Sequence, residues 1–244
     1  MIFLKKNLPD IIAVLPAAGI GRRMKCRVPK QYSMIGNKTL LEYSISTLMC
    51  QSCIKQIIVV ISSSDHWFRK LSISNDAKVA TVIGGKTRTD SVMAALKYMD
   101  KVDWVIVHDA VRPCLHQDDL LRLLEITVYS CVGGILAIPV ADTIKKACVN
   151  SSRLIDYTVN RKNLWRALTP QLFNFSLLKC SLSSVLEKGY IISDESSALE
   201  LFGYHPQLII GRSDNIKVTY PEDLILASIY LSQIRENEEF LKCV

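Results

Sequence analysis

The chain has 244 residues, of which 49% are hydrophobic and 22% are charged, and its formal net charge is +7. This composition supplies enough apolar side chains for a folded core and excludes an intrinsically disordered chain. The positive charge suits a protein that binds phosphates, but it also suits a protein that binds nucleic acid, so charge alone does not separate these classes.

Short apolar runs bounded by turn residues recur along the chain and predict buried strands. Segments with helical spacing lie between them, so strands and helices alternate as in a doubly wound sheet. We expect one three-layer α/β domain over residues 1–244, with a mostly parallel sheet. The predicted strands are Ile11–Leu15, Ile57–Ile61, Val79–Ile83, Trp104–His108 and Gly134–Ile138, and the predicted helices between them are Leu40–Met49, Ser91–Tyr98 and Asp118–Tyr129.

The segment from Val140 to Arg161 breaks this alternation. Two strand-like stretches flank a polar turn at residues 149–152, which is the pattern of a β-hairpin. We therefore expect a protruding hairpin arm at about residues 139–162. Helical patterns follow it at Leu177–Leu186, Ser196–Phe202 and Pro221–Ser232.

The loop from Pro16 to Lys30 directly follows the first predicted strand, and ligands of parallel α/β sheets bind beyond such strand ends. Small residues let backbone N–H groups approach a polyphosphate, and basic side chains add fixed positive charge. The loop therefore predicts a site for a nucleoside triphosphate. Its small residues are Ala17, Ala18, Gly19 and Gly21, and its cations include Arg23 and Lys30.

Asp109 and Arg112 follow the predicted strand Trp104–His108, so they emerge at the same edge of the sheet. A carboxylate at this edge can hold a hydrated Mg²⁺ against phosphate oxygens, and Arg112 can meet another phosphate. The alternative is a structural ion pair between Asp109 and Arg112.

Two glycine motifs imitate other nucleotide sites. The third glycine of a dinucleotide-binding fingerprint would fall at Met24, which weakens that interpretation. The tripeptide Gly85-Lys86-Thr87 resembles the end of a P-loop, but the opening glycine of that motif would fall at Ala80. Neither motif is complete.

Taken together, the motifs resemble the family of 2-C-methyl-D-erythritol 4-phosphate cytidylyltransferases, with a match that runs in order from about Ile12 to Ile229. The first motif is shared by many sugar-nucleotide transferases, whereas the whole ordered set is highly specific. The motifs are Pro16–Met24 (PAAGIGRRM), Pro29–Tyr32 (PKQY), His108–Pro113 (HDAVRP), Asp142-Thr143, Leu168–Gln171 (LTPQ), Asp194-Glu195 and Asp214–Thr219 (DNIKVT).

The resemblance implies a Rossmann-like nucleotidyltransferase fold and transfer of CMP from CTP to 2-C-methyl-D-erythritol 4-phosphate, with Mg²⁺ as the cofactor. It assigns the cytosine and ribose to one group of residues and the reacting phosphates to another. The first group is Ala17, Ala18, Gly19, Gly84, Gly85 and Ser91, and the second is Arg23, Lys30 and Lys217, with Asp109 near the metal.

The resemblance also implies that Arg112, Thr143 and Arg161 bind the alcohol phosphate, and that the arm reaches into the partner's site in a homodimer. Two residues depart from the common pattern. Lys86 stands where many relatives have an acid, which affects contacts with the base. Ser193 stands where many have threonine, and since it keeps the hydroxyl group we assign it to substrate binding.

Three alternative functions stay open on the sequence alone. A transferase for another alcohol or sugar phosphate would keep the nucleotide loop, an NAD-dependent oxidoreductase would need the glycine that Met24 replaces, and a non-catalytic nucleotide or nucleic-acid binder would use the charge. We expect no nucleic-acid partner because no reading motif is recognisable. The scattered cysteines and the lack of a long apolar run predict a cytoplasmic protein without a membrane partner.

Overall fold

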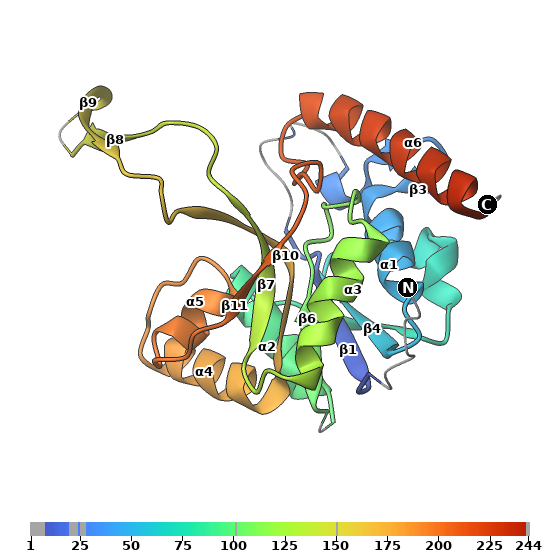
Figure 1. The fold of residues 1–244 in the computed structure, drawn as a ribbon. Coiled ribbons are helices and arrows are strands. Elements are labelled where there is room, and N and C mark those ends of the chain that lie inside the picture. Colours follow the sequence, from blue (N-terminus) through green and yellow to red (C-terminus); the bar gives the residue numbers. More distant parts are fainter. Residues whose placement is uncertain (1–7, 20–23, 25–27, 101, 150, 243–244) are drawn as a thin grey trace.

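The computed structural model describes residues 8–19, 24, 28–100, 102–149 and 151–242, and the fold is built on one seven-stranded sheet (Figure 1). The strand order is β11-β7-β10-β6-β1-β4-β5. Every pair is parallel except those of β10, which runs antiparallel to both β6 and β7. The strands are β1 (Ile11–Pro16), β4 (Ile54–Ile61), β5 (Val79–Ile83), β6 (Trp104–Val107), β7 (Gly133–Pro139), β10 (Trp165–Asn174) and β11 (Gln207–Ile210).

Helices cover both faces of this sheet, which confirms the predicted three-layer α/β fold with a mostly parallel sheet. The alternation of side chains along β1 supplies both interfaces: Ala13 and Leu15 pack into one core cluster and Val14 into the other. The helices are α1 (Leu40–Met49), α2 (Arg88–Tyr98), α3 (Gln117–Glu125), α4 (Phe175–Glu187), α5 (Glu195–Glu200) and α6 (Glu222–Lys242).

Helix α1 and helix α3 share one core cluster with the sheet, whereas α2, α4 and α5 pack into the cluster on the other face. A third cluster joins Met24 to Val218 and to Leu231 of α6. Short 3₁₀ turns and a small hairpin complete the body: η2 (Lys30–Tyr32), β2 (Met34–Ile35), β3 (Lys38–Thr39), η3 (Phe68–Lys70), η4 (Ser72–Asn75) and η5 (Ile126–Val128).

The predicted arm is a separate two-stranded antiparallel sheet of β8 (Ile144–Cys148) and β9 (Ser151–Val159). Figure 1 shows it extended away from the body at the upper left. Its root is closed by a hydrogen bond of 3.0 Å from Val140 N to Leu164 O, after which the chain returns directly into β10. The predicted protruding hairpin is therefore confirmed.

Some predicted boundaries differ from the structure. Helix α2 begins at Arg88 because the Thr87 side chain accepts from Asp90 N while the Asp90 carboxylate accepts from Thr87 N, a capping box that fixes the first turn. The predicted helix Asp118–Tyr129 ends at Glu125 and continues as η5. Strands β10 and β11 had no counterpart in the sequence-based prediction.

Candidate functional site

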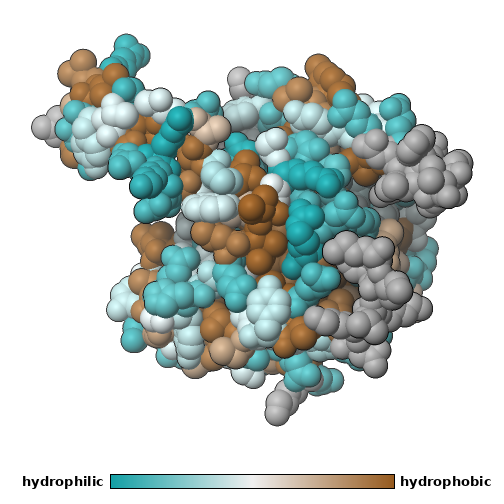
Figure 2. Space-filling view, viewed as in Figure 1, coloured by the Kyte–Doolittle hydropathy of each residue, from teal (hydrophilic) through white to brown (hydrophobic). Residues whose placement is uncertain are grey.

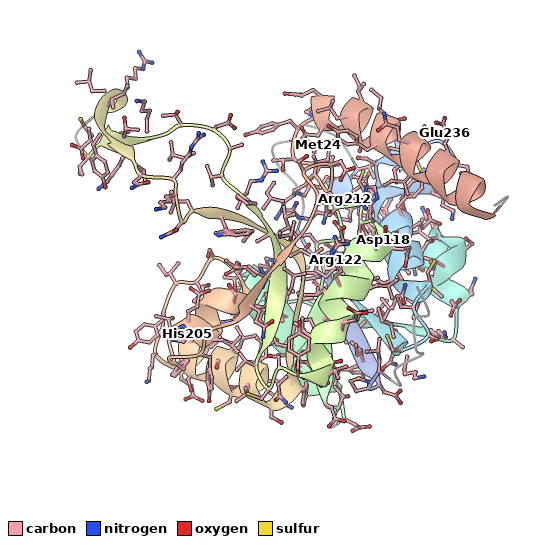
Figure 3. The ribbon with its side chains drawn as sticks, viewed as in Figure 1. Met24, Asp118, Arg122, His205, Arg212 and Glu236 are labelled. Carbon is pink, nitrogen blue, oxygen red and sulfur yellow. The ribbon has the colours of Figure 1, made fainter. Side chains whose placement is uncertain are left out.

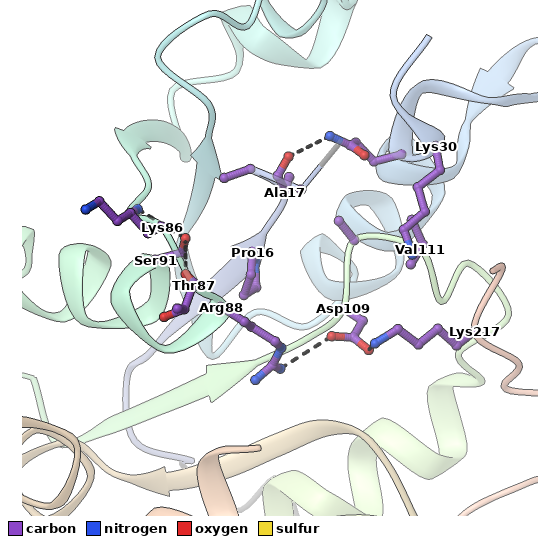
Figure 4. A pocket seen from close by; sticks show the side chains of 15 residues that line it. Pro16, Ala17, Lys30, Lys86, Thr87, Arg88, Ser91, Asp109, Val111 and Lys217 are labelled. Carbon is purple, nitrogen blue, oxygen red and sulfur yellow. Dashed lines mark hydrogen bonds and ion pairs between the residues drawn. The ribbon is translucent and has the colours of Figure 1, made fainter. Parts of the chain in front are cut away.

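A pocket of about 210 Å³ opens beside the loop that follows β1 and the residues that follow β6 (Figure 4). Eight of the residues predicted from the sequence line it together, although they come from five distant parts of the chain. They are Ala17, Ala18, Gly19, Lys30, Gly85, Ser91, Asp109 and Lys217.

Hydrogen bonds hold the start of the β1 loop in place from both sides. Ala17 N donates to Val60 O of β4 across 2.7 Å, and the buried side chain of Gln31 donates from Nε2 to Ala17 O across 2.6 Å. Because Gln31 belongs to η2, the same turn that carries Lys30 is fastened to the loop. The hydrogen bond from Gln31 therefore links the turn that carries Lys30 to the pocket wall.

The paired glycines allow a close approach between the β5–α2 connection and the β1 loop. A Cβ atom on Gly84 would lie 2.8 Å from both Ala18 Cβ and Ser91 Oγ, and one on Gly85 would lie 2.3 Å from Asp90 Cβ. Gly85 N donates to Ser91 Oγ across 3.2 Å. Gly84 thus packs behind the pocket, while Gly85 and Ser91 line it.

Asp109 lies in the middle of a cluster of three cations. Its carboxylate is 2.8 Å from Lys217 Nζ, 3.3 Å from Arg88 Nη2 and 3.5 Å from Arg112 Nε. Burial raises the pKa of this carboxyl group, but the charges of Arg88, Lys217 and Arg112 outweigh burial and hold the pKa well below its usual range. Asp109 is therefore ionised at neutral pH.

The backbone of Asp109 is fixed by the residues beneath it. Thr169 Oγ1 accepts from Asp109 N across 3.0 Å and lies 3.0 Å from His108 Nδ1, while His108 Nε2 lies 3.1 Å from Arg112 O. Burial lowers the pKa of His108 to about 4, so the ring is neutral. A neutral ring with its proton on Nε2 satisfies all three contacts, with Thr169 donating to Nδ1.

The segment that carries Lys217 is tied to the same loop. Val218 N donates to Val111 O across 2.9 Å, and Arg112 Nη1 donates to Asn215 O across 2.7 Å. The buried Asn215 side chain donates to Thr169 O across 2.9 Å. The position of Lys217 is therefore set by backbone contacts on either side of it.

A second cavity, of about 240 Å³, adjoins the first. Arg88, Asp109 and Lys217 line both cavities, so these three residues form the boundary between them. The other wall lies on β10 and at the start of α5. The predicted substrate residues Arg112 and Ser193 line it, together with Ala167, Leu168, Thr169, Gln171 and Asp194.

Besides Gly84, two described residues of the predicted site lie outside both cavities. Thr143 and Arg161 stand at the two ends of the arm, where both side chains are exposed. The predicted residues Gly21 and Arg23 lie outside the described residues. Their roles, like those of the residues brought together above, remain predictions.

Arg88 is the main site residue that the sequence did not single out. It occupies the first position of α2, and its guanidinium group contacts both Asp109 and Glu195. Figure 4 shows the contact with Asp109. Lys86 also lines the first pocket, on the side away from Lys30 and Lys217. In the part of the chain that the structure describes, no group of three acidic, histidine or cysteine side chains could hold a metal ion.

The sheet topology and the cation-rich pocket at its strand ends define a nucleotidyltransferase. The family model described as 2-C-methyl-D-erythritol 4-phosphate cytidylyltransferase matches residues 11–233, so the chain belongs to this family. A relative from Blochmanniella pennsylvanica with that name is 60% identical over 231 residues, which cover 95% of this chain and 98% of the relative. Another relative with the same name, from Baumannia cicadellinicola, is 59% identical over 235 residues, which cover 96% of this chain and 98% of the relative.

Solved structures agree with this assignment. The Francisella tularensis 2-C-methyl-D-erythritol 4-phosphate cytidylyltransferase superposes with a TM-score of 0.79 at 34% identity, covering 91% of this chain and 99% of that chain. A 4-diphosphocytidyl-2C-methyl-D-erythritol synthase gives a TM-score of 0.78 at 36% identity, covering 91% and 98%. Among the described residues, no helix has both the length and the apolar character that crossing a membrane requires.

Proposed function

We propose that the first cavity binds CTP, that the second binds 2-C-methyl-D-erythritol 4-phosphate, and that reaction occurs at their boundary. As a member of its family, the enzyme transfers CMP from CTP to this alcohol phosphate, which yields 4-diphosphocytidyl-2-C-methyl-D-erythritol and pyrophosphate for isoprenoid precursor biosynthesis. One observation carries the assignment of sites: Arg88, Asp109 and Lys217 line both cavities, so a phosphate in each would meet at this cluster.

The nucleotide occupies the first cavity with its base beside Gly85 and Ser91, where the loops approach most closely. Its ribose lies along the loop formed by Ala17, Ala18 and Gly19, with Gly84 supporting that loop from behind. The triphosphate then extends toward Lys30 and Lys217. Arg23 and Gly21 belong to the same loop and complete the triphosphate site in this proposal.

The nucleophile is the phosphate group of the second substrate. Its second pKa is about 6, so it is largely dianionic near neutral pH and needs no general base. One of its oxygens attacks the α-phosphorus of CTP, and the bond from that phosphorus to the oxygen bridging the β-phosphate breaks, releasing pyrophosphate. Arg23, Lys30 and Lys217 stabilise the charge that develops at phosphorus, which is the main catalytic requirement when two anions react.

The surroundings of Asp109 fit a Mg²⁺ ion that arrives together with the triphosphate. Mg²⁺ is commonly held by one or two carboxylates, with substrate phosphates and water supplying the other oxygen ligands. Asp109 is the one carboxylate among the described residues that line the first pocket, and it is ionised. Bound there, the ion would neutralise part of the phosphate charge, and Lys217 would neutralise more of it.

The alcohol phosphate occupies the second cavity, where Arg112 and Ser193 contact it. Thr143 and Arg161 complete this site from the arm of a second copy of the chain. Large apolar side chains on the arm support the homodimer: the exposed fractions are 94% for Val149, 63% for Leu154 and 64% for Ile155. Figure 2 shows brown, hydrophobic surface on the protruding arm at the upper left.

The reaction takes place in the cytoplasm in this proposal, because CTP is present there and both charged substrates cross membranes poorly. The activity is tested with purified protein, CTP, Mg²⁺ and 2-C-methyl-D-erythritol 4-phosphate, with pyrophosphate release as the measurement. UTP and ATP are the nucleotide controls, and a panel of other alcohol and sugar phosphates controls for the second substrate. Release with CTP but only with a different phosphate would overturn the substrate assignment.

A further inference from the structure

Arg88 connects two acids that lie far apart in the sequence. Its Nη1 atom donates to Oε1 of Glu195 in the first turn of α5, and its Nη2 atom donates to Oδ1 of Asp109 after β6 across 3.3 Å. The exposed fractions of the side chains are 1% for Glu195, 9% for Asp109 and 30% for Arg88. One planar guanidinium group therefore spans two buried carboxylates, which a single ammonium group cannot do with the same geometry.

The one side-chain contact described for Glu195 is its ion pair with Arg88. In the described part of the chain, its Oε1 contacts Arg88 and its Oε2 has no hydrogen-bond partner. Burial raises the pKa of Glu195, and the charge of Arg88 opposes that effect. Removing Arg88 would therefore leave a buried carboxyl group without its one described partner, which is costly for a buried pair.

The contacts around the boundary show which groups Arg88 holds together. Three cations, Arg88, Arg112 and Lys217, contact Asp109, and Arg88 also contacts Glu195. Arg88 occupies one oxygen of Asp109, whereas Lys217 and Arg112 approach the other. Arg88 therefore restrains one oxygen of the Asp109 carboxylate, while Lys217 and Arg112 restrain the other.

We propose that Arg88 is a positioning residue, held by Glu195, that sets the orientation of the Asp109 carboxylate between the two substrates. The proposal rests on the function proposed above, because the role of Asp109 at the reacting phosphates is part of that function. Arg88 acts through Asp109 and contributes to turnover, while CTP binding depends on the loop after β1. Glu195 contributes through Arg88.

The primary test compares Arg88→Gln with the wild-type enzyme under saturating substrates. We expect kcat to fall by about 10–100-fold, as is usual for groups that orient a reacting residue, while the KM for CTP changes by less than about 3-fold. Arg88→Lys restores part of kcat, because an ammonium group can still meet Asp109. A kcat equal to the wild-type value, or a loss confined to the KM for CTP, would overturn the proposal.

A matched control separates positioning from general loss of stability. Arg122 pairs with the buried Asp119 across 2.5 Å; both residues belong to α3, and neither lines either cavity. Figure 3 labels Arg122 on this helix. Arg122→Gln also leaves a buried acid with one cation fewer, so it lowers the melting temperature, but kcat stays within about 2-fold of wild type. Equal kcat losses in Arg88→Gln and Arg122→Gln would reject positioning.

A double-mutant cycle tests whether Arg88 acts through Asp109. In an Asp109→Asn background, Arg88→Gln lowers kcat by less than about 2-fold further, because residues that act as one unit are not additive. A full additional loss would mean that Arg88 contacts substrate itself and would overturn the proposal. Glu195→Gln, which keeps the shape of the side chain, provides the same test if Arg88→Gln does not fold.

Failure of the proposed function is distinguishable from failure of this inference. Wild-type protein that releases no pyrophosphate from CTP and the alcohol phosphate contradicts the function. Active wild-type protein with an equally active Arg88→Gln variant contradicts only the positioning role.

Discussion

The ammonium group of Lys217 lies 2.8 Å from the carboxylate of Asp109, and this contact joins the segment after β11 to the segment after β6. Both residues line the two adjoining cavities. The contact places a cation where the substrates of the proposed reaction meet, and it holds the Lys217 ammonium group and the Asp109 carboxylate against each other.

Replacing Lys217 by alanine is expected to lower kcat by roughly 10²-fold or more, because a preorganised positive group at the reacting phosphates is lost. Steady-state pyrophosphate release measures the effect. Lys97→Ala, an exposed substitution on α2, is the control and should leave kcat unchanged. Near-normal turnover of Lys217→Ala would remove this residue from catalysis.

Lys30→Ala is expected to reduce turnover by roughly 10²-fold or more as well, since Lys30 enters the nucleotide cavity from the turn that Gln31 fastens to Ala17. The same assay applies, with CTP saturating. Gln31→Ala is expected to lower kcat less, because it leaves the charge in place and loosens only the support. A larger loss in Gln31→Ala than in Lys30→Ala would contradict this order.

Arg161→Ala is expected to raise the KM for the alcohol phosphate and to leave the KM for CTP nearly unchanged. The arm hypothesis adds a sharper test, in which Arg161→Ala and Lys30→Ala subunits are unfolded together and reassembled as mixed dimers. At an alcohol phosphate concentration too low for Arg161→Ala to turn over, a random mixture recovers about one quarter of wild-type activity if the arm serves the partner's site, because half of the dimers then contain one intact site of two. No recovery would place the arm in its own subunit's site.

Thr169→Val removes the hydroxyl that Asp109 N and His108 Nδ1 share. It leaves a buried N–H group without a partner, so the free energy of unfolding is expected to fall by about 1–3 kcal/mol. Urea denaturation measures this change. Thr47→Val, which removes a helix-surface hydroxyl bonded to Tyr43 O, is the control and should cost less. An equal loss in the free energy of unfolding for both variants would mean that the Thr169 hydroxyl stabilises the fold no more than an ordinary helix hydroxyl does.

Stability should fall between pH 6.5 and 4 because of His108. Burial lowers the pKa of the folded-state ring from 6.5 to about 4, so in this window the unfolded chain binds a proton that the folded chain does not. The free energy of unfolding therefore decreases as pH falls, by at most about 1.4 kcal/mol per pH unit. Asp109, whose folded pKa is depressed, adds a further loss at lower pH, once the unfolded carboxyl takes up its proton.

Urea denaturation from pH 7.5 to 4.5 measures this slope. His108→Gln is expected to lower stability at neutral pH and to flatten the pH dependence above pH 4.5. An unchanged slope in the variant would assign the pH dependence to other groups.

The sequence predicted the strands of the parallel core because apolar runs such as Ile57–Ile61 are continuous and bounded by turn residues. It did not predict β10, whose first residues are exposed and whose interior contains Pro170 and Gln171, so that neither a continuous nor an alternating apolar pattern is visible. Strand β11 has four residues, three of them apolar, which is too short for periodicity to identify.

Most of the predicted residues that line the first pocket follow a strand or belong to a recognisable motif, and Ser91 was assigned only through the family resemblance. Arg88 carries no such local signal. Its partners are 21 and 107 positions away, at Asp109 and Glu195, and only the folded chain brings them together. Gly84 was predicted to contact the nucleotide, but its place behind the pocket depends on a packing distance to Ala18 that spacing alone does not reveal.

Strand β10 joins the arm directly to the wall of the second cavity, so in a dimer it would link one subunit's site to the contacts of its arm. The chain leaves the arm at residues 160–164 and enters β10 without another element, and the same strand carries Leu168, Thr169 and Gln171 along the wall of the second cavity. A displacement of the arm would therefore also displace the first residues of β10, a strand inside the sheet. In a dimer of the proposed kind, a contact between the arm and the partner subunit would be linked through β10 to the residues beneath Asp109 in the subunit that carries the arm.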